Sequence, residues 1–513
     1  MARSLLNHSV LIALGLGLAG AIGCSGSGTS GTSGTGGFGG SSDATTSTST
    51  SSATSGSVSS SASSSASGTG GSGGIGGGTS SATASATGTG GMGTGGMGTG
   101  GMGTGGAGTS SGSGGNPNDV DLDGDGWSAN EGDCCDTKVG SCLTPTLVNP
   151  GAFEYLGNGV DDDCDPATLD NVVPKDCAPP ALTVPTSSDD LIKAMDLCQF
   201  TMEAPPKATK KWGVIKTSLL LADGSSAVAP KDLQVGVLAN YGTNVLPRKG
   251  PTMAALSSGT ARDVGDIGYV HPQNGTLAGQ SGNYDAKTQV GVPAPWLAAH
   301  NGVVPSPGNC PVCSGATCAQ AFDSVNLKAR IRVPTNAKSF SYSFKFYTAE
   351  FPEFVCQQYN DFFLTLLKSA WVPAPVGPCM VDADCESVTC AAGMCVKAQP
   401  LPADSNISFD GLKNAVSVNN GFFEVCFPAV NAPAGACPSG TADLAGTGMG
   451  GWGSNLKDGG GTEWLINDAP VVPGETMEIQ FVTWDAGDHN VDSLVLLDKF
   501  RWNVTPSAVG VHQ

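Results

Sequence analysis

The sequence predicts a mainly β protein, a disulfide-rich antiparallel β-sandwich preceded by a small acidic metal-binding module and a long disordered N-terminal stalk. Apolar residues alternate with polar ones along residues 325–333 and 340–346, which is typical of half-buried strands. The chain has 17 cysteines, 16 of them between Cys134 and Cys437, which indicates disulfides in an oxidising compartment. Residues 117–170 hold 13 Asp and Glu against one Lys, a density typical of cation binding or of disorder.

Residues 1–23 have the order of an export signal. Arg3 is the only Lys or Arg before the apolar residues 5–22, and small residues then lead to Cys24. The apolar core is too short and too rich in glycine to form a stable membrane-spanning helix. This order resembles a bacterial lipoprotein signal, which implies that Cys24 carries the lipid anchor and that the protein is an outer-membrane or cell-surface lipoprotein. Ordinary secretion with cleavage near Ala21 is the alternative, and either signal exports the chain.

Residues 24–116 form the predicted stalk. Between residues 25 and 115 there is no Lys or Arg, one Asp and one aromatic residue, so the segment cannot bury enough apolar surface to fold. As a glycine-rich coil it spans on the order of 50 Å. The repeated Met92, Met97 and Met102 are thioethers that can bind Cu(I), but without His or Cys nearby a spacer is the favoured interpretation.

Residues 117–171 contain the predicted metal-binding module. Asp121, Asp123 and Asp125 occupy alternate positions and Gly126 follows, as at the start of an EF-hand-type Ca²⁺ loop. The twelfth position of such a loop requires Glu, but here it is Gly132, so we expect a shorter loop closed by Asp133.

A second acidic cluster lies at residues 158–165 and adds Asp161, Asp163 and Asp165 as candidate ligands. Together with residues 123–126, 131–134 and 150–154, this cluster resembles the MopE-type metal-binding motif, found on secreted and surface proteins of Gram-negative bacteria such as myxobacteria. The resemblance covers residues 119 to about 165 and implies copper. The all-oxygen ligand set instead favours Ca²⁺, with copper as the alternative, and a solvated acidic linker is the non-functional interpretation.

Residues 172–513 form the predicted sandwich and hold nearly all the aromatic residues. Residues 477–481 and 494–502 continue the alternation seen at 325–333 and 340–346. The one helix that we expect covers residues 191–200, capped by residues 188–190.

Four closely spaced cysteines mark an insertion in this domain at residues 376–398. They are Cys379, Cys385, Cys390 and Cys395. Because an exported chain is oxidised, we expect a two-disulfide loop, with a zinc site as the alternative.

Several stretches of the C-terminal domain resemble the choice-of-anchor L family of bacterial surface domains. The resemblance covers most of residues 190–505 and is carried by residues 250–261, 346–363, 406–420 and 472–493. It implies display at the cell surface, where family members use varied anchors. In this chain the implied anchor is Cys24.

Acidic residues recur where the predicted strands end: Glu350, Glu353, Asp361, Asp485, Asp488 and Asp492. Strand ends from separate segments meet at one edge of a sandwich, so we expect a second Ca²⁺ site that uses Asp361 and Asp485, completed by Glu353 or Asp488. A glycosidase carboxylate pair and ordinary solvated loop acids are the alternatives.

The sequence as a whole favours a non-enzymatic, Ca²⁺-stabilised binding or adhesion module on the cell surface, whose partner is a glycan or a surface protein. The formal net charge of −20 argues against nucleic acid. Only five histidines are present, and neither a nucleophile elbow outside the stalk nor a zinc-protease helix occurs. A secreted polysaccharide hydrolase with a carboxylate pair and a metal-scavenging surface protein are the alternatives.

Overall fold

The structure is a computed structural model that describes residues 116–513 except 173–175, 186, 228–232, 273–283, 309, 316, 374–376, 382–389, 396–398, 420–421, 429–436 and 452–456. The predicted signal peptide, Cys24 and nearly all of the stalk lie outside the described residues. Within the described part of the chain, no helix is both long enough and apolar enough to cross a membrane.

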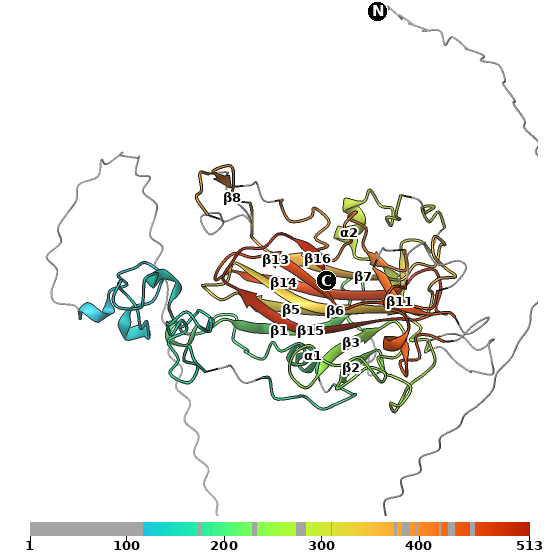
Figure 1. Cartoon of the computed structure of the whole chain (residues 1–513), viewed down its shortest axis with the longest axis horizontal. Coiled ribbons are helices and arrows are strands. Elements are labelled where there is room, and N and C mark those ends of the chain that lie inside the picture. Colours follow the sequence, from blue (N-terminus) through green and yellow to red (C-terminus); the bar gives the residue numbers. More distant parts are fainter. Residues whose placement is uncertain are drawn as a thin grey trace, which may run out of the picture. The chain divides into compact units, whose positions relative to one another are not determined.

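The strands form two antiparallel sheets (Figure 1). The six-stranded sheet has the order β1-β5-β14-β7-β10, and β4 also pairs with β5. Its strands are β1 (Gly213–Leu220), β4 (Gln289–Gly291), β5 (Gln320–Arg332), β7 (Phe362–Lys368), β10 (Val416–Ser417) and β14 (Thr476–Asp485). Strand β14 lies in the centre and pairs with β5 on one side and β7 on the other.

The eight-stranded sheet has the order β11-β12-β6-β15-β3-β2, with β13 also paired to β6 and β16 paired to β13. Its strands are β2 (Val235–Leu238), β3 (Met253–Ser257), β6 (Ser339–Thr348), β11 (Phe423–Cys426), β12 (Gly460–Thr462), β13 (Leu465–Pro470), β15 (Ser493–Asn503) and β16 (Gly510–His512). Strand β6 is central because β15 lies on one side of it and β12 and β13 share the other.

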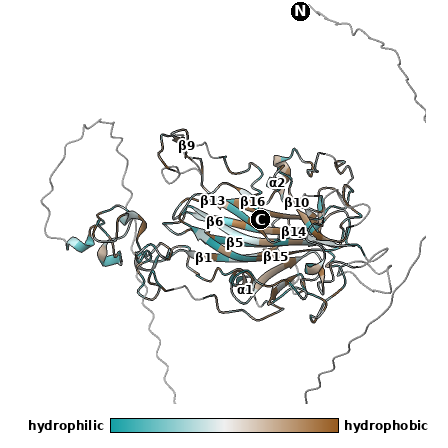
Figure 2. Ribbon diagram, viewed as in Figure 1, coloured by the Kyte–Doolittle hydropathy of each residue, from teal (hydrophilic) through white to brown (hydrophobic). Residues whose placement is uncertain are grey.

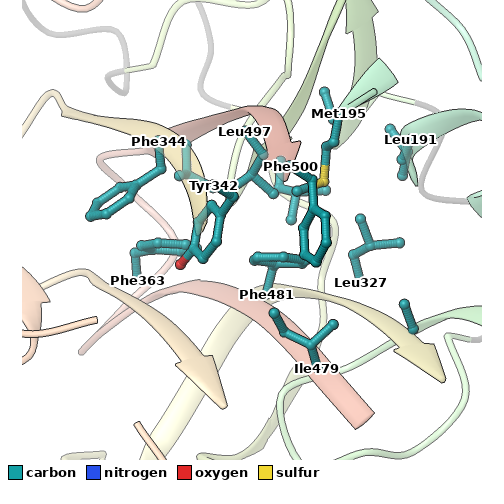
Figure 3. Close-up of a cluster of buried hydrophobic side chains, with 14 of the residues drawn as sticks. Leu191, Met195, Leu327, Tyr342, Phe344, Phe363, Ile479, Phe481, Leu497 and Phe500 are labelled. Atoms are coloured by element: carbon teal, nitrogen blue, oxygen red, sulfur yellow. The ribbon is translucent and has the colours of Figure 1, made fainter. Parts of the chain in front are cut away.

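The main core lies between the two sheets. In β5, Val325, Leu327, Ala329 and Ile331 are fully buried, and in β6 the residues from Phe340 to Phe346 at alternate positions are equally buried. Figure 3 shows Leu327 of β5 and Tyr342 and Phe344 of β6 together with labelled residues of β7, β14 and β15, namely Phe363, Ile479, Phe481, Leu497 and Phe500. Because successive side chains of a strand point to opposite faces, the apolar residues at alternate positions all face the other sheet and form this core. The predicted antiparallel β-sandwich is confirmed.

Both sheets also have covered outer faces. Trp296 in α2 (Ala294–Ala299) packs on Phe362 and Trp484 of the six-stranded sheet, with ring centroids 5.7 and 5.8 Å away. A second cluster around Tyr241 and Tyr347 covers the eight-stranded sheet. Residues 481–485 of β14 and 493–498 of β15 are therefore buried on both faces of their sheets. Figure 2 shows hydrophobic residues along β15.

The predicted helix at residues 191–200 is shorter than expected. Helix α1 covers Ser188–Ala194, and the N–H of Ser187 donates to the carboxylate of Asp190 at 3.2 Å. The chain leaves the helix because Asp196 adopts a left-handed conformation (φ 67°). Cys198 then forms a disulfide with Cys177. Helix α2 was not predicted from the sequence.

Short 3₁₀ helices account for much of the remaining regular structure. They are η1 (Pro117–Asp119), η2 (Ala129–Glu131), η3 (Pro145–Leu147), η4 (Lys207–Thr209) and η6 (Ala442–Leu444).

Disulfides link many of the loops. The described pairs are Cys134–Cys164, Cys135–Cys142, Cys177–Cys198, Cys310–Cys356, Cys313–Cys318, Cys379–Cys390 and Cys426–Cys437. Within the cysteine-rich insertion, β8 (Cys390–Ala391) and β9 (Met394–Cys395) form a small hairpin. Cys395 is also disulfide-bonded, which fits the expected two-disulfide loop better than a zinc site, while Cys385 lies outside the described residues.

The acidic module docks on the sandwich at the turn between β5 and β6. The N–H of Phe153 donates to Asn336 at 3.0 Å, and the hydroxyl of Thr335 donates to Asn149 at 2.7 Å. Two lysines that precede β1 add ion pairs, Lys207 with Glu131 and Lys211 with Asp165. These pairs are exposed, so the hydrogen bonds at the turn contribute the specificity of the contact.

Candidate metal centres

The first half of the acidic module folds around Asp121. Its two carboxylate oxygens accept the N–H groups of Gly124 (2.7 Å) and Gly126 (2.9 Å). Both glycines have positive φ, 83° and 101°, which a residue with a side chain rarely adopts. These turns bring carboxylate oxygens of Asp121, Asp123 and Asp125 within 4.8 Å of one another.

A second group shares Asp123 with the first. Oxygens of Asp123, Asp133 and Asp136 also lie within 4.8 Å of one another. Asp133 is 6% exposed, and its Oδ2 has no hydrogen-bond partner among the described residues. The structure therefore places Asp133 beside the loop that it was expected to close. Asp136, which was not selected from the sequence, is the added member.

A third group lies in the second half of the module. Asp161 and Asp163 come within 4.8 Å of Glu154, which was not selected as a ligand from the sequence. Glu154 Oε1 and Asp161 Oδ1 are buried and without a hydrogen-bond partner in the described part of the chain. Asp165 points elsewhere, because its carboxylate pairs with Lys211 at 3.1 Å.

The Cys134–Cys164 disulfide joins the two halves. Each cysteine directly follows a carboxylate of a different group, Asp133 or Asp163. Glu154 lies seven residues before Asp161, so sequence spacing alone does not group it with Asp161 and Asp163.

Burial makes several of these carboxylates hard to ionise. It raises the pKa of Asp125 and of Asp133 to about 6, and that of Glu154 to about 7. Repulsion from neighbouring acids raises these pKa values further. Among the described residues, Lys207 and Lys211 lie near the module but pair with Glu131 and Asp165, outside the three groups. A bound cation would relieve this repulsion.

A fourth group is buried at one end of the sandwich. It contains Glu350, two residues after β6, Asp361, which directly precedes β7, and Asp485, the last residue of β14. Strand β6 belongs to the eight-stranded sheet, and β7 and β14 to the six-stranded sheet. Oxygens of these three carboxylates lie within 4.8 Å of one another, so the group joins the ends of both sheets.

This inter-sheet cluster, Glu350, Asp361 and Asp485, is almost inaccessible, with exposed fractions of 2%, 0% and 1%. The N–H of Ala486 donates to Asp361 Oδ1 at 3.0 Å, and the N–H of Asp361 donates to Glu350 at 3.2 Å. Asp361 Oδ2 and both oxygens of Asp485 have no hydrogen-bond partner among the described residues. Burial raises the pKa of Asp361 to about 8 and those of Glu350 and Asp485 well above their ordinary values.

The two residues expected to complete this site lie differently. Glu353 faces Asp458 instead. Its pKa is raised to about 8, mainly by burial and to a smaller extent by the contact with Asp458. Glu350 takes its place, because β6 extends to Thr348 and so carries Glu350 to the strand end. The charge of Asp488 contributes to the raised pKa of Asp485. The Oδ1 atom of Asp488 accepts the N–H of Asn490 at 2.9 Å, and Asp488 is not one of the three grouped carboxylates.

A fifth group combines His489 with Asp323 and Asp285. The Nδ1 atom of His489 lies 2.8 Å from Asp323 and 3.3 Å from Asp285. A hydrogen bond joins His489 to Asp323, and the backbone N–H of Thr288 donates to the other oxygen of Asp323, so this group has its own hydrogen-bond partners.

The donor chemistry of the module and of the inter-sheet cluster is uniform. Every ligand candidate is a carboxylate oxygen, and separations up to 4.8 Å suit a shared ion with metal–oxygen distances of about 2.4 Å, as for Ca²⁺. A glycosidase pair requires carboxylates that flank a sugar, about 5–10 Å apart and open to it. The inter-sheet cluster is too closed for that chemistry.

No family model, no curated protein and no solved structure matches this chain.

Proposed function

We propose that this protein is a cell-surface lipoprotein that displays a Ca²⁺-stabilised binding module, with a glycan or a surface protein as its partner. In this proposal Cys24 carries the lipid, residues 24–116 are the tether, and the acidic module and the sandwich are the displayed part. The resemblances to MopE-type motifs and to choice-of-anchor L domains belong to the same proposal.

The observation that carries the proposal is the convergence of carboxylates in the acidic module. Eight acids from residues 121–163 form three groups, and Asp133 and Glu154 keep buried oxygens without partners among the described residues. Burying such oxygens is costly unless a cation binds them. Oxygen-only ligands select hard cations, and Ca²⁺ tolerates the irregular geometry that loops provide.

A display role also agrees with how the module is built. Two disulfides close its loops, and hydrogen bonds at Asn336 and Thr335 attach it to the sandwich. An ion would then stabilise a rigid unit between the tether and the sandwich. Metal scavenging as the main activity is less favoured, because none of the three groups contains the His or Cys that would favour copper.

Calorimetric titration of the mature chain tests the metal. We expect Ca²⁺ binding that the triple substitution D121N/D123N/D133N weakens by at least tenfold, and D223N, an exposed acid outside the groups, serves as the matched control. Tight Cu²⁺ binding without measurable Ca²⁺ binding would contradict the proposal and favour scavenging.

Cell fractionation tests the anchor. We expect Cys24→Ala to release the protein from the membrane fraction, whereas Cys24→Ala protein that stays fully membrane-bound would place the anchor elsewhere.

A further inference from the structure

The end of the sandwich that carries the inter-sheet cluster holds negative charge without a matching cation. The charged groups that act on Asp485 are Asp361, Glu350, Asp488 and Asp492, all of them acids. Two basic residues on the elements that reach this end have partners of their own, since His489 contacts Asp323 and Lys345 pairs with Asp443 and Glu463. A folded protein cannot leave three ionised carboxylates buried together without compensation.

We propose that Glu350, Asp361 and Asp485 bind one Ca²⁺ ion inside the sandwich, and that this ion clamps the two sheets to each other. The inference goes beyond the proposed function, which rests on the acidic module. It concerns an interior site whose ligands come from three separate strand ends.

Geometry supports a single shared ion. Opposite ligands of Ca²⁺ are about 4.6–5.2 Å apart, since each Ca²⁺–oxygen distance is about 2.3–2.6 Å. The three carboxylates meet this limit, with oxygens within 4.8 Å of one another. Three of their oxygens are buried without any hydrogen-bond partner in the described residues, as a cation would require.

The surroundings can supply further oxygen ligands. Asn360 is 7% exposed, and its Oδ1 atom is also buried without a partner among the described residues. A cavity of about 20 Å³ lies beside it, lined also by Phe362, Ala486 and Gly487. One water molecule needs about 10–15 Å³ of such space, so this cavity can hold a water molecule next to Asn360.

The position of the site explains why an ion there stabilises the fold. Glu350 extends from the eight-stranded sheet, and Asp361 and Asp485 belong to the six-stranded sheet. Near this end, the Cys310–Cys356 disulfide holds the loop between Glu350 and Asp361. An ion bound only by the folded state contributes about 2.7 kcal/mol when its concentration is a hundredfold above Kd, which raises Tm by about 4 °C for a domain of this size.

The decisive experiment uses the mature full chain with all three module groups disabled by D121N/D123N/D133N/D161N/D163N. Because the cluster is closed, the protein is unfolded in chelator and refolded with Ca²⁺, with Tb³⁺ or with chelator alone. We expect Ca²⁺ to raise Tm in this background. Terbium should show emission sensitised by Trp484, the neighbour of Asp485. The variant W484F should reduce this emission, whereas W371F, at a partly exposed site, should not.

Variants of the ligands complete the test. Asp485→Asn and Asp361→Asn should each abolish the Ca²⁺-dependent rise in Tm, while the protein in chelator stays folded because a buried charge has been removed. Glu353→Gln is the matched control, since this buried acid lies on the same loop and faces Asp458.

Two results would overturn the inference. One is a Tm that is the same with Ca²⁺ and with chelator and that falls as the pH rises from about 4 to about 8, which would mean that protons neutralise the cluster. The other is a loss of the Ca²⁺ effect in Glu353→Gln equal to that in Asp485→Asn. Neither result affects the module, whose ligands are absent from this background.

Discussion

Removal of the Cys134–Cys164 disulfide should destabilise the acidic module more than removal of its neighbour, Cys135–Cys142. The first bridge closes a loop with a sequence separation of 30, and the second a loop with a separation of 7. In the chain-entropy description, these loops contribute about 3.6 and about 2.4 kcal/mol respectively to the stability of the folded module. The difference of about 1.2 kcal/mol arises because the longer loop restricts the unfolded chain more strongly.

The Cys134–Cys164 bridge should also have the larger effect on metal binding. It joins Asp133 to Asp163, and therefore links two carboxylate groups, whereas Cys135–Cys142 lies within one half of the module. We expect C134A/C164A to weaken Ca²⁺ binding at both groups, and C135A/C142A to leave the group of Glu154 unchanged.

Hydrogen exchange of peptides from residues 117–171 measures the stability of the module separately from that of the sandwich. Loss of about 3.6 kcal/mol accelerates exchange by roughly 400-fold, and loss of about 2.4 kcal/mol by roughly 60-fold. If C134A/C164A exchanges no faster than C135A/C142A, or if it keeps full Ca²⁺ affinity, the account of this module as two halves held by one bridge is wrong.

Three further outcomes follow from the sandwich. Tyr342→Phe should cost about 1–2 kcal/mol in urea unfolding, because its buried hydroxyl bonds to Thr365 across the two sheets, while Tyr155→Phe at an exposed site should be neutral. Gly259→Ala should cost about 1–3 kcal/mol in the same assay, because its Cβ would lie 1.9 Å from the carboxylate of Asp492. Burial raises the pKa of Asp498 to about 7, so the folded state binds the proton of this carboxyl more tightly than the unfolded chain does. The free energy of unfolding should therefore fall as the pH rises from about 4 to about 7, and Asp498→Ala should remove this part of the pH dependence.

The strands of the sandwich could be predicted because their signal is local. Residues 325–333 alternate with a period of two, and the structure buries the same apolar face that the alternation defines. The extent of helix α1 could not be predicted as well, because its end depends on the left-handed Asp196 and on the Cys177–Cys198 disulfide. Helix α2 has only six residues, too few for a helical period to be visible in the sequence.

The candidate metal centres were predictable only in part. Asp121, Asp123 and Asp125 share one short loop, so spacing alone groups them. Whether Glu350 or Glu353 joins the inter-sheet cluster depends on the residue at which β6 ends, and sequence patterns locate strand ends poorly. Glu154 joins Asp161 and Asp163 through the folding of the whole module, which no local pattern encodes.

Strand β6 separates the two candidate metal regions. It begins at Ser339, near the turn that binds the acidic module, and ends at Thr348, beside the inter-sheet cluster. Ten residues of a strand span about 33 Å, which is several times the screening length of about 8 Å at physiological ionic strength. Charging one region therefore has almost no influence on the other. If both regions bind Ca²⁺ as proposed, an ion gained at the module would leave the affinity of the inter-sheet cluster unchanged, and the protein would respond to calcium over two independent concentration ranges.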